Sequence, residues 1–506
     1  MLTALLAGLW LLVGPATADL AAQLHRVGLF AANGFAVWDN SWYGGHHLPG
    51  YSLVFPAVGA AVGVRLAGAS AAVASAALFD ALVAGRGATA ARWWFAVGCS
   101  ADLLIGRMTY ALGVSFGLAA VFALVHHRPR SAAVLALGCA ATSPVAGLFL
   151  ALVCAALWIV DRHWAALVTG LAALAGVVAL SVAFPEGGSQ PFSWSSFAVT
   201  LSISLAAAVA VGRRRHLRVA LVLYAAAAVL CFVIASPMGG NITRLGTAFA
   251  APVLLVAAAT APAVRRVVLL LILCAAAAWQ WIDPITQAAR GWDDPSAASA
   301  YYQPLVAKLR AVGATAGRVE VPFTQGHWET VYLARRFALA RGWERQLDRR
   351  LNPLFYDHRL TPAVYDRWLR ANAVDYVALP DTRMDPSGRT EAAMVRRGAP
   401  FLQQIWAGRH WRLYRVLDPL ALGSGRAGAV RLTGSGVRVE VRRPGSVLLR
   451  VHWTPYWDVT GGRACVSPRA GWTLLKTPET GTFTLTARFS VARLVQDRPG
   501  CAVPGP

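Results

Sequence analysis

Charged residues are scarce in this chain. Only 14% of its 506 residues are Asp, Glu, Lys or Arg, while 57% are hydrophobic and the mean hydropathy is +0.50. An ordinary soluble domain carries about 25% charged residues. The composition therefore excludes a soluble enzyme, a disordered chain and a small disulfide scaffold.

Lysine is nearly absent. Lys308 and Lys476 are the only two lysines among 47 basic residues, so the net charge of +23 comes from arginine. No basic run is interleaved with aromatic residues on a predicted soluble element, and we therefore expect no nucleic-acid partner. The arginine excess fits proximity to anionic lipids or to lipid-linked anionic substrates.

Cysteines are few, and none has the spacing of a zinc or redox site. Five of the seven lie in apolar stretches, whereas Cys465 and Cys501 lie in the polar tail. If the tail occupies an oxidising compartment, these two should form a disulfide. We expect neither a metal nor a cofactor.

The charges are unevenly distributed along the chain. Residues 1–290 contain 16 basic and 7 acidic residues, and the remaining 216 contain 31 and 17. This distribution predicts a membrane domain over residues 1–285, followed by a soluble tail. A spanning helix needs about 20 apolar residues, and we expect eleven spans, near 1–18, 51–84, 93–106, 109–125, 131–143, 145–160, 164–183, 194–212, 217–235, 245–262 and 267–282.

Two of these stretches have alternative interpretations. Residues 51–84 are too long for one untilted crossing, so they form either two spans or one span preceded by a dipping segment. Residues 1–18 end in Ala16-Thr17-Ala18, which resembles a signal-peptidase site. No basic residue precedes this apolar run, which favours an uncleaved helix.

Basic clusters predict the orientation. Arg128 and Arg130, Arg213–Arg215, and Arg265-Arg266 mark cytoplasmic turns. With these turns inside, everything after residue 283 faces the outside. The loop 19–50 also faces the outside if 51–84 is one crossing, which we expect, and faces the inside if 51–84 is two. We therefore expect a multi-pass plasma-membrane protein with an extracytoplasmic C-terminal domain.

The segment 19–51 carries the strongest functional signal. It places ionisable and aromatic residues between apolar spans, and ionisable groups at a membrane are costly and usually functional. Asp19 and Asp39 are the candidate catalytic carboxylates. The candidate substrate-binding residues in this segment are His25, Arg26, Trp38, Trp42, Tyr43, His46, His47 and Tyr51. The alternative is an aromatic belt at the lipid interface.

Other polar positions could complete the site. Arg107, near Asp102 and Tyr110, follows an expected outside turn, and Asn241 and Arg244 lie in a short outside loop. Arginine presents a planar fork to phosphate oxygens, so Arg107 and Arg244 are candidates for binding a lipid phosphate. A helix-internal Asp–Arg pair and a tight interfacial turn are the structural alternatives.

The sequence patterns of the tail predict two modules. Strand patterns at 318–322 and 375–380 alternate with helical patterns near 328–340 and 362–372, which indicates a small α/β domain over 286–422. Residues 423–435 are rich in Gly, Ala and Ser, a composition that predicts a linker. Strand patterns at 436–442, 446–451 and 481–487 indicate a C-terminal β-sandwich over 436–506.

The chain also resembles a known family. An aspartate just after the first helix, a long first outside loop ending in Pro49-Gly50-Tyr51, a many-spanned body and an outside tail resemble the GT-C superfamily of integral-membrane glycosyltransferases. The string GFAVWDNSWYGGHHLPGYS is similar to actinobacterial membrane proteins of that superfamily. The resemblance covers residues 1–285 and implies a mainly α GT-C-like fold of about 11 transmembrane helices.

The resemblance implies a function as well. Such enzymes use lipid-phosphate-linked sugars, and a loop aspartate acts as base on the acceptor hydroxyl; here only Asp19 or Asp39 matches it, and Asp19 has the better position. The expected outer loops lack an Asp-x-Asp or Glu-x-Asp pair, which favours a metal-independent, monophosphate-linked donor. The expected partners are a polyprenyl-phosphate sugar and an envelope glycan or lipid acceptor. The alternatives are a multi-pass transporter or flippase, and a non-catalytic envelope-assembly protein.

Overall fold

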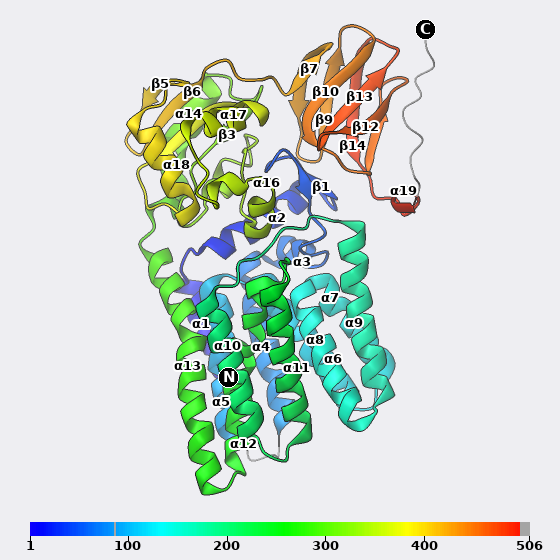
Figure 1. Ribbon diagram of the computed structural model, residues 1–506, viewed down its shortest axis with the longest axis vertical. Helices are drawn as coiled ribbons and strands as arrows, with labels where there is room; N and C mark the ends of the chain where they lie inside the picture. The colour runs from blue at the N-terminus through cyan, green and yellow to red at the C-terminus, as the bar shows by residue number, and fades with distance from the viewer. Residues whose placement is uncertain (85–87, 496–506) are drawn as a thin grey trace. The chain divides into compact units, whose positions relative to one another are not determined.

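The computed structural model describes residues 1–84 and 88–495 and divides the chain into two compact units (Figure 1). The first unit comprises Met1–Gln23 and Gly50–Asp293, and the second comprises Leu24–Pro49 and the chain from Asp294 onward. The sequence places 24–49 in the membrane domain, but in the structure this segment belongs to the second unit by its contacts.

The first unit is helical throughout. Each apolar stretch identified in the sequence forms one helix or two, and Figure 1 shows them as a bundle. The helices of this unit are α1 (Leu2–Val13), α3 (Phe55–Val62), α4 (Val64–Val83), α5 (Thr89–Ile105), α6 (Met108–Val125), α7 (Pro129–Thr142), α8 (Pro144–Asp161), α9 (Trp164–Ala183), α10 (Trp194–Ala210), α11 (Arg215–Val233), η1 (Gly239–Ile242), α12 (Thr243–Ala259) and α13 (Ala263–Trp292). Helix α2 (Ala18–Asn33) begins in this unit and ends in the second.

The eleven expected spans are not shown. Among the described residues, seven helices are long and apolar enough to cross a membrane, or eight if the bent pair α1 and α2 counts as one span. The seven are α4, α6, α8, α9, α11, α12 with its preceding η1, and α13. Helices α1 and α7 have 12 and 14 residues, which at 1.5 Å per residue is about 18 and 21 Å, well short of a hydrocarbon core of about 30 Å.

The long stretch 51–84 is one candidate span preceded by a short helix. Helix α3 has eight residues, about 12 Å, and only α4 is long enough to cross. Gly63 separates the two with a φ of +89°, in the left-handed region that glycine adopts without strain. The backbone break at Gly63 therefore decides between the two interpretations of this stretch.

Small residues let the helices pack closely. A Cβ at Gly68 of α4 would lie 2.1 Å from the Met108 sulfur, and one at Gly113 of α6 would lie 2.7 Å from Ser143 Cβ. Lipid gives apolar helices no hydrophobic reason to associate, so close backbone approach through small residues is a main source of their attraction. Gly68 and Gly113 therefore allow neighbouring helices of the first unit to pack closely.

A mixed four-stranded sheet forms the first part of the second unit. Its order is β3-β4-β6-β5, with β3 (Arg318–Glu320) parallel to β4 (Val374–Pro380), and with β6 (Trp411–Val416) antiparallel to both β4 and β5 (Leu402–Ala407). The helices of this part are η2 (Pro295–Ala297), α14 (Ser299–Ala311), α15 (Glu329–Tyr332), α16 (Arg345–Leu351), η3 (Pro353–Phe355), α17 (Pro362–Ala371) and α18 (Pro386–Arg397). The predicted strands near 318 and 375 and the helix near 362–372 are confirmed.

The helix predicted over 328–340 is wrong beyond its first turn. Helix α15 ends at Tyr332, and residues 338–340 run alongside β3 instead. Val319 N–H donates to the Ala338 carbonyl at 2.9 Å, and Ala340 N–H donates to the Val319 carbonyl at 3.0 Å. The open edge of β3 offers backbone hydrogen bonds that override the local helical pattern.

Two four-stranded antiparallel sheets form the second part, in the orders β12-β13-β10-β7 and β11-β14-β9-β8. Their strands are β7 (Gly423–Gly425), β8 (Ala427–Leu432), β9 (Gly436–Val441), β10 (Gly445–His452), β11 (Trp457–Thr460), β12 (Cys465–Arg469), β13 (Trp472–Thr477) and β14 (Gly481–Ala487), followed by the short α19 (Ala492–Val495). Alternate residues of β9 and β10 are buried, so each of these strands has one covered face. Cys465 is disulfide-bonded, and its predicted partner Cys501 lies outside the described residues.

The predicted linker 423–435 is wrong, because it contains strands β7 and β8, which pair with β10 and β9. A Cβ at Gly423 would lie 2.5 Å from Val430 Cγ2 and 2.9 Å from Ala427 Cβ. The glycine therefore allows close approach of two strands, a role that composition does not distinguish from flexibility.

The segment 24–49 is bound into the second unit by backbone and side-chain hydrogen bonds. It contains the end of α2 and a hairpin of β1 (Trp38–Asp39) and β2 (His46–His47). The Asn40 amide donates to the carbonyls of Gly436 at 2.7 Å and Thr433 at 3.0 Å, and Asn40 N–H donates to Gly434 at 2.8 Å. Asn40 is 2% exposed, so these bonds form away from solvent.

Replacing Asn40 by alanine should loosen this attachment. The change removes two buried hydrogen bonds worth about 1 kcal/mol each and leaves the two carbonyls unsatisfied. We expect amide exchange in peptides covering 433–441 to accelerate about 30-fold, measured by hydrogen–deuterium exchange mass spectrometry. The control is Asn241→Ala, because Asn241 belongs to the first unit and, among the described residues, its side chain bonds only to the Pro237 carbonyl of its own turn. Equal protection in Asn40→Ala and the unmodified chain would contradict the attachment.

Candidate functional site

Ionisable side chains gather at one end of the first unit's helices. Arg107, the residue before α6, contacts Asp19 at 3.4 Å and Asp283 of α13 at 3.2 Å. Their side chains are between one fifth and one half exposed. We call Asp19, Tyr51, Arg107, Arg244 and Asp283 the helix-end cluster.

Gly106 makes the approach of Asp19 to Arg107 possible. It ends α5 with a φ of +93°, and a Cβ there would lie 2.6 Å from the Leu20 backbone nitrogen. The Thr17 hydroxyl donates to the Ile105 carbonyl at 2.7 Å, next to this turn. Only glycine fits both the conformation and the space, so this turn positions the first turn of α2 against the start of α6.

A polar chain links Tyr51 to the same region. The Gln23 amide donates to the Tyr51 hydroxyl at 3.0 Å, and the Thr109 hydroxyl donates to the Gln23 side-chain carbonyl. Gln23 is 1% exposed and Thr109 is 3% exposed. These hydrogen bonds fix Tyr51 relative to helices α2 and α6.

Arg244 opens α12 and is half-buried. Its guanidinium lies 5.4 Å from the centre of the Tyr110 ring, within electrostatic range of Asp19, Arg107 and Tyr51. Among the described residues it makes no ion pair, and the buried Tyr110 hydroxyl makes no hydrogen bond. A half-buried cation without a carboxylate partner is well suited to bind an anion.

Asn241 does not join the cluster by any contact in the described part of the chain. Its side-chain amide donates to the Pro237 carbonyl at 3.1 Å and is exposed. This bond stabilises the turn that precedes α12, as the structural alternative for this loop predicts.

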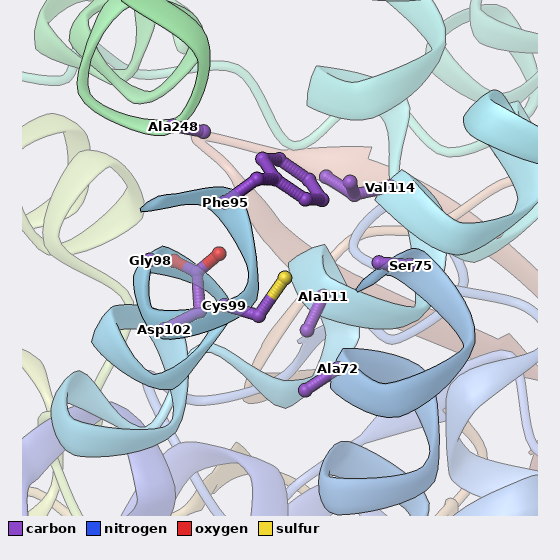
Figure 2. A pocket seen from close by; sticks show the side chains of 9 residues that line it. All are labelled: Ala72, Ser75, Phe95, Gly98, Cys99, Asp102, Ala111, Val114 and Ala248. Atoms are coloured by element: carbon purple, nitrogen blue, oxygen red, sulfur yellow. The ribbon is translucent and has the colours of Figure 1, made fainter. Parts of the chain in front are cut away.

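A small cavity lies between α4, α5, α6 and α12 (Figure 2). Its volume of about 20 Å³ is enough for about one water molecule. Asp102, Cys99 and Ser75 supply its polar lining, and the buried Ser75 hydroxyl has no hydrogen-bond partner in the described residues. The cavity is too small for a sugar or a lipid chain.

The aromatic and histidine residues of 24–49 form a packed cluster within the second unit. The Trp42 ring stacks with His25, at 4.0 Å between ring centres, and with His46, at 5.7 Å. Trp42 is fully buried, and a Cβ at Gly342 would lie 2.3 Å from its ring, so Gly342 packs directly on the indole.

His25 and Asp39 are a buried pair joined at 2.8 Å between Nε2 and Oδ2. The other Asp39 oxygen accepts Ser41 N–H at 2.7 Å. Burial lowers the pKa of His25 despite the neighbouring carboxylate. Burial disfavours the charged form of Asp39, but the His25 contact prevails and lowers the pKa of Asp39. A neutral His25 donating to an ionised Asp39 holds the hairpin in place.

The remaining candidates of this segment also pack inside the second unit. Arg26 pairs with Glu344 at 2.7 Å, and the Tyr43 hydroxyl donates to the Gly342 carbonyl. The His47 ring lies at 2.9 Å from the Thr454 hydroxyl and meets Trp38 edge-on. These side chains tie 24–49 to both parts of the second unit.

The structure thus sorts the candidate residues into two groups. The first unit holds Asp19, Tyr51, Arg107, Asn241 and Arg244, and the second holds His25, Arg26, Trp38, Asp39, Trp42, Tyr43, His46 and His47. The sequence analysis places Asp19, Tyr51 and the whole second group in one loop, 19–51. The end of α2 and the β1–β2 hairpin hold the second group, and both belong to the second unit.

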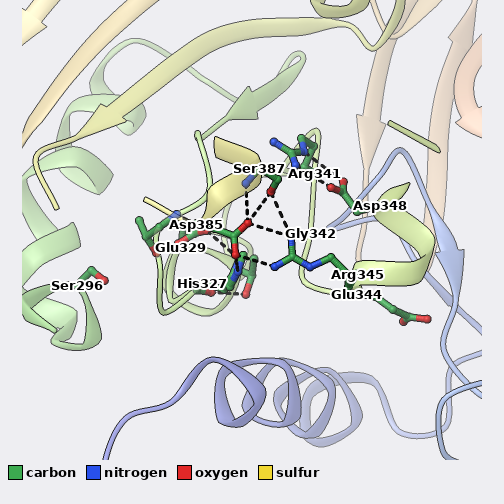
Figure 3. Close-up of polar contacts among 12 residues, drawn as sticks. Ser296, His327, Glu329, Arg341, Gly342, Glu344, Arg345, Asp348, Asp385 and Ser387 are labelled. Carbon is green, nitrogen blue, oxygen red and sulfur yellow. Dashed lines mark hydrogen bonds and ion pairs between the residues drawn. The ribbon is translucent and has the colours of Figure 1, made fainter. Parts of the chain in front are cut away.

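The second unit contains another charged cluster, around His327 (Figure 3). The ring stacks on Trp343 at 3.6 Å, with Nδ1 at 3.6 Å from Glu329 and Nε2 at 3.5 Å from Asp385. Arg345 holds both Asp385 oxygens, at 2.6 and 2.9 Å. Burial lowers the pKa of His327. Burial disfavours the charged form of Asp385, but the neighbouring His327 ring and the Arg345 guanidinium outweigh burial and lower the pKa of Asp385.

Burial raises the pKa of Glu329 to about 8, against hydrogen bonds from Thr324. Glu329 is 1% exposed, and the Thr324 hydroxyl lies 2.5 Å from its Oε2. The carboxyl group is therefore mostly protonated at neutral pH.

Nearby, Arg341 is fully buried between the Phe323 and Phe355 rings, at 3.9 and 3.8 Å. It binds Asp348 at 2.7 Å and Glu391 at 3.2 Å. This arginine is the central cation of the α/β part, and its partners are structural.

Sequence reasoning missed several of these residues. Asp283, Gln23 and Thr109 in the first unit, and Arg341, Asp348 and Asp385 in the second, were not identified. A signal for Asp283 exists, since it is the one acidic residue within the apolar pattern of α13. Arg341 and Asp348 lie seven residues apart in an ordinary polar stretch and give no such signal.

Among the described residues, no group of three or more His, Cys, Asp or Glu side chains is arranged to hold a metal ion. Comparison with protein-family models finds no match, and comparison with curated proteins finds none either. The site must therefore be interpreted from its own geometry.

Glu329 should make stability depend on pH. Its pKa is about 8 in the folded chain and 4.5 ordinarily, so the folded state holds an extra proton between these values. The stabilisation is complete below about pH 4.5 and is lost as pH rises to about 8, on the order of several kcal/mol. Thermal unfolding followed by tryptophan fluorescence should show a smaller loss from pH 5 to 8 for Glu329→Gln than for the unmodified chain.

The control for this measurement is Glu440→Gln, because Glu440 is exposed on strand β9. This variant should follow the unmodified chain across the same pH range. Parallel curves for Glu329→Gln and the unmodified chain would show that Glu329 is ionised in the fold.

Proposed function

We propose that this protein is an integral-membrane glycosyltransferase of the GT-C type. It would move a sugar from a polyprenyl-phosphate donor to an envelope glycan or lipid acceptor on the outer face of the plasma membrane. The observation that carries the proposal is the helix-end cluster, in which Arg244 makes no ion pair among the described residues and lies within electrostatic range of the partly exposed carboxylate Asp19. The resemblance of residues 1–285 to that superfamily supports it.

The cluster contains the groups that this transfer requires. Arg244 binds the donor phosphate and stabilises the charge that develops when the bond between the sugar carbon and the phosphate oxygen breaks. The acceptor hydroxyl attacks the sugar carbon, and its proton passes to Asp19. Arg107 is a positioning residue, because it contacts the Asp19 carboxylate at 3.4 Å. Polyprenyl phosphate leaves with the electron pair of the broken bond.

Asp19 is a better base than Asp39. Asp39 is fully buried, and its two oxygens already contact His25 and Ser41. Asp19 keeps about a third of its side chain exposed, so an acceptor can reach it. We accordingly assign the buried His and aromatic residues of 24–49 to the architecture of the second unit, rather than to sugar contact.

The direction of the helices supports an outside location for the cluster. Arg107 and Arg244 stand at the starts of α6 and α12, whereas the basic turns at 126–130 and 260–266 follow the ends of the same helices. The cluster and the basic turns therefore lie at opposite ends of the bundle. Because basic turns favour the cytoplasm, the cluster faces outward.

A transporter or flippase is the second candidate. The observation in its favour is Asp102, an ionisable residue of α5 that lines the small cavity among the helices. Proton coupling would use such a residue. The two candidates differ in what accumulates without the protein, since a transferase leaves its lipid-linked sugar donor unused on the outer leaflet.

The orientation has its own test. Arg359→Cys, in an exposed loop of the second unit, should react with a membrane-impermeant maleimide in intact cells. Arg130→Cys, exposed at the start of α7, should react only after lysis. The reverse pattern would place the second unit in the cytoplasm. The unmodified chain gives the background from its own cysteines, of which Cys465 is disulfide-bonded.

Removing the base should strongly slow the transfer. Asp19→Asn is nearly isosteric and should lower activity by about 10²–10⁴-fold, and Arg244→Gln by about 10²–10³-fold. In a deletion strain complemented with either variant, lipid analysis should find an accumulated polyprenyl-phosphate sugar. Both variants should be produced and inserted at normal levels.

The matched control is Asp80→Asn, which removes a carboxylate from a partly exposed Asp–Arg pair with Arg92, outside the cluster. This variant should complement fully. Full complementation by Asp19→Asn would remove Asp19 from the mechanism. Asp39→Asn should instead reduce the amount of folded protein, since Asp39 anchors the hairpin.

A further inference from the structure

An arginine pair stands out on the sheet β11-β14-β9-β8. In the register of β8 and β9, Arg431 lies directly opposite Arg438. Both side chains are exposed, while the neighbouring Val437 and Val439 point inward and are fully buried. Facing residues on adjacent strands have their Cβ atoms about 4.5–5.5 Å apart, and like charges at such positions destabilise a sheet.

The acidic residues of this sheet do not neutralise the pair. Glu440, two residues after Arg438, accepts Ala429 N–H at 3.3 Å and contacts Arg442 at 3.7 Å. Asp458 on β11 binds Arg493 at 2.9 Å and contacts Arg488 at 4.0 Å. Among the described residues, Arg431 and Arg438 make no ion pair, so their charge is available to an external anion.

Hydroxyl groups continue the row across the sheet. Thr484 of β14 lies opposite Arg438, and Thr460 of β11 lies opposite Thr484. Thr482 and Thr486 flank Thr484 on the same face, because residues two apart on a strand share a face. The face therefore combines two adjacent guanidinium groups with a row of threonine side chains.

The same face lacks the side chains that insert into lipid. On the described strands β8, β9, β11 and β14, no large hydrophobic residue is exposed. A surface that docks on a membrane combines basic residues with exposed apolar ones. Hydroxyl groups beside arginines instead match the hydroxyl and acidic groups of a charged carbohydrate.

We propose that this face, formed by Arg431, Arg438, Thr484 and Thr460, binds an anionic polysaccharide. Each guanidinium donates paired hydrogen bonds to a carboxylate or phosphate of the glycan, and the threonines bond its hydroxyl groups. Binding also relieves the repulsion between the two arginines. This inference does not depend on the proposed transferase activity, because it concerns a sheet in the second unit and a binding event without chemistry.

Binding of defined polymers to the full-length protein in zwitterionic nanodiscs tests the proposal. The probes are alginate, which carries carboxylates, poly(glycerol phosphate), which carries phosphates, and neutral dextran. We expect one or both anionic polymers to bind, with dextran not binding. At low salt, the double variant Arg431→Gln/Arg438→Gln should bind the anionic polymers at least about tenfold more weakly than the unmodified chain. The variant Thr484→Val should also weaken binding, although it leaves the charge unchanged.

The matched control is Arg396→Gln/Arg397→Gln, which removes the same charge from exposed arginines at the end of α18. It should bind like the unmodified chain. Equal weakening in both double variants would show that binding depends on net charge rather than on this face, and would overturn the proposal. Binding of phosphatidylglycerol vesicles without binding of either polymer would also overturn it and would indicate a lipid partner.

A second measurement checks the geometry without any ligand. Because Arg431 and Arg438 repel one another, the single variant Arg438→Gln should keep or slightly raise the thermal unfolding temperature. A marked decrease would show that the pair is structural and would overturn the assignment.

Discussion

Hydrocarbon cannot hydrogen-bond to a peptide group, and this constraint shapes the first unit. Each backbone polar group within the apolar stretches must be satisfied by its own helix, so the described part of that unit contains helices and short turns. The same constraint drives ionisable side chains to helix ends. Asp19, Arg107 and Arg244 lie near helix starts, and Asp283 of α13 joins them, although the four residues are spread over more than 260 positions of the sequence.

Glycines determine where that gathering occurs. Gly106 combines a φ of +93° with direct contact to the start of α2, and thus places Asp19 beside Arg107. Gly63 similarly divides the stretch 51–84 into α3 and α4. In a chain with few charged residues, backbone turns that no other residue tolerates are as important for the site as the polar residues themselves.

In the second unit, several buried charged side chains are instead paired with side chains of opposite charge. Arg341 is surrounded by Asp348, Glu391 and two aromatic rings, and burial raises the pKa of Arg341's neighbour Glu320 well above its ordinary value. In the segment 24–49, the buried His25–Asp39 pair and the stacking of His25 on Trp42 likewise stabilise ionisable side chains inside the unit. A segment rich in ionisable and aromatic residues can therefore be a core rather than a ligand site.

Composition and hydropathy alone determined the division into an apolar helical part and a polar part, because burial in lipid requires long runs of apolar residues. Period-two patterns likewise predicted β9 and β14, since one face of each strand is covered. Tertiary structure decided what local pattern cannot express. The open edge of β3 extended residues 338–340, strand pairing ordered 423–432, and helices of 12 to 17 residues fell short of the expected spans. It also assigned Asp19 and Asp39 to different compact units, because hydrogen bonds from Asn40 and the packing of Gly342 on Trp42 join 24–49 to residues several hundred positions later in the chain.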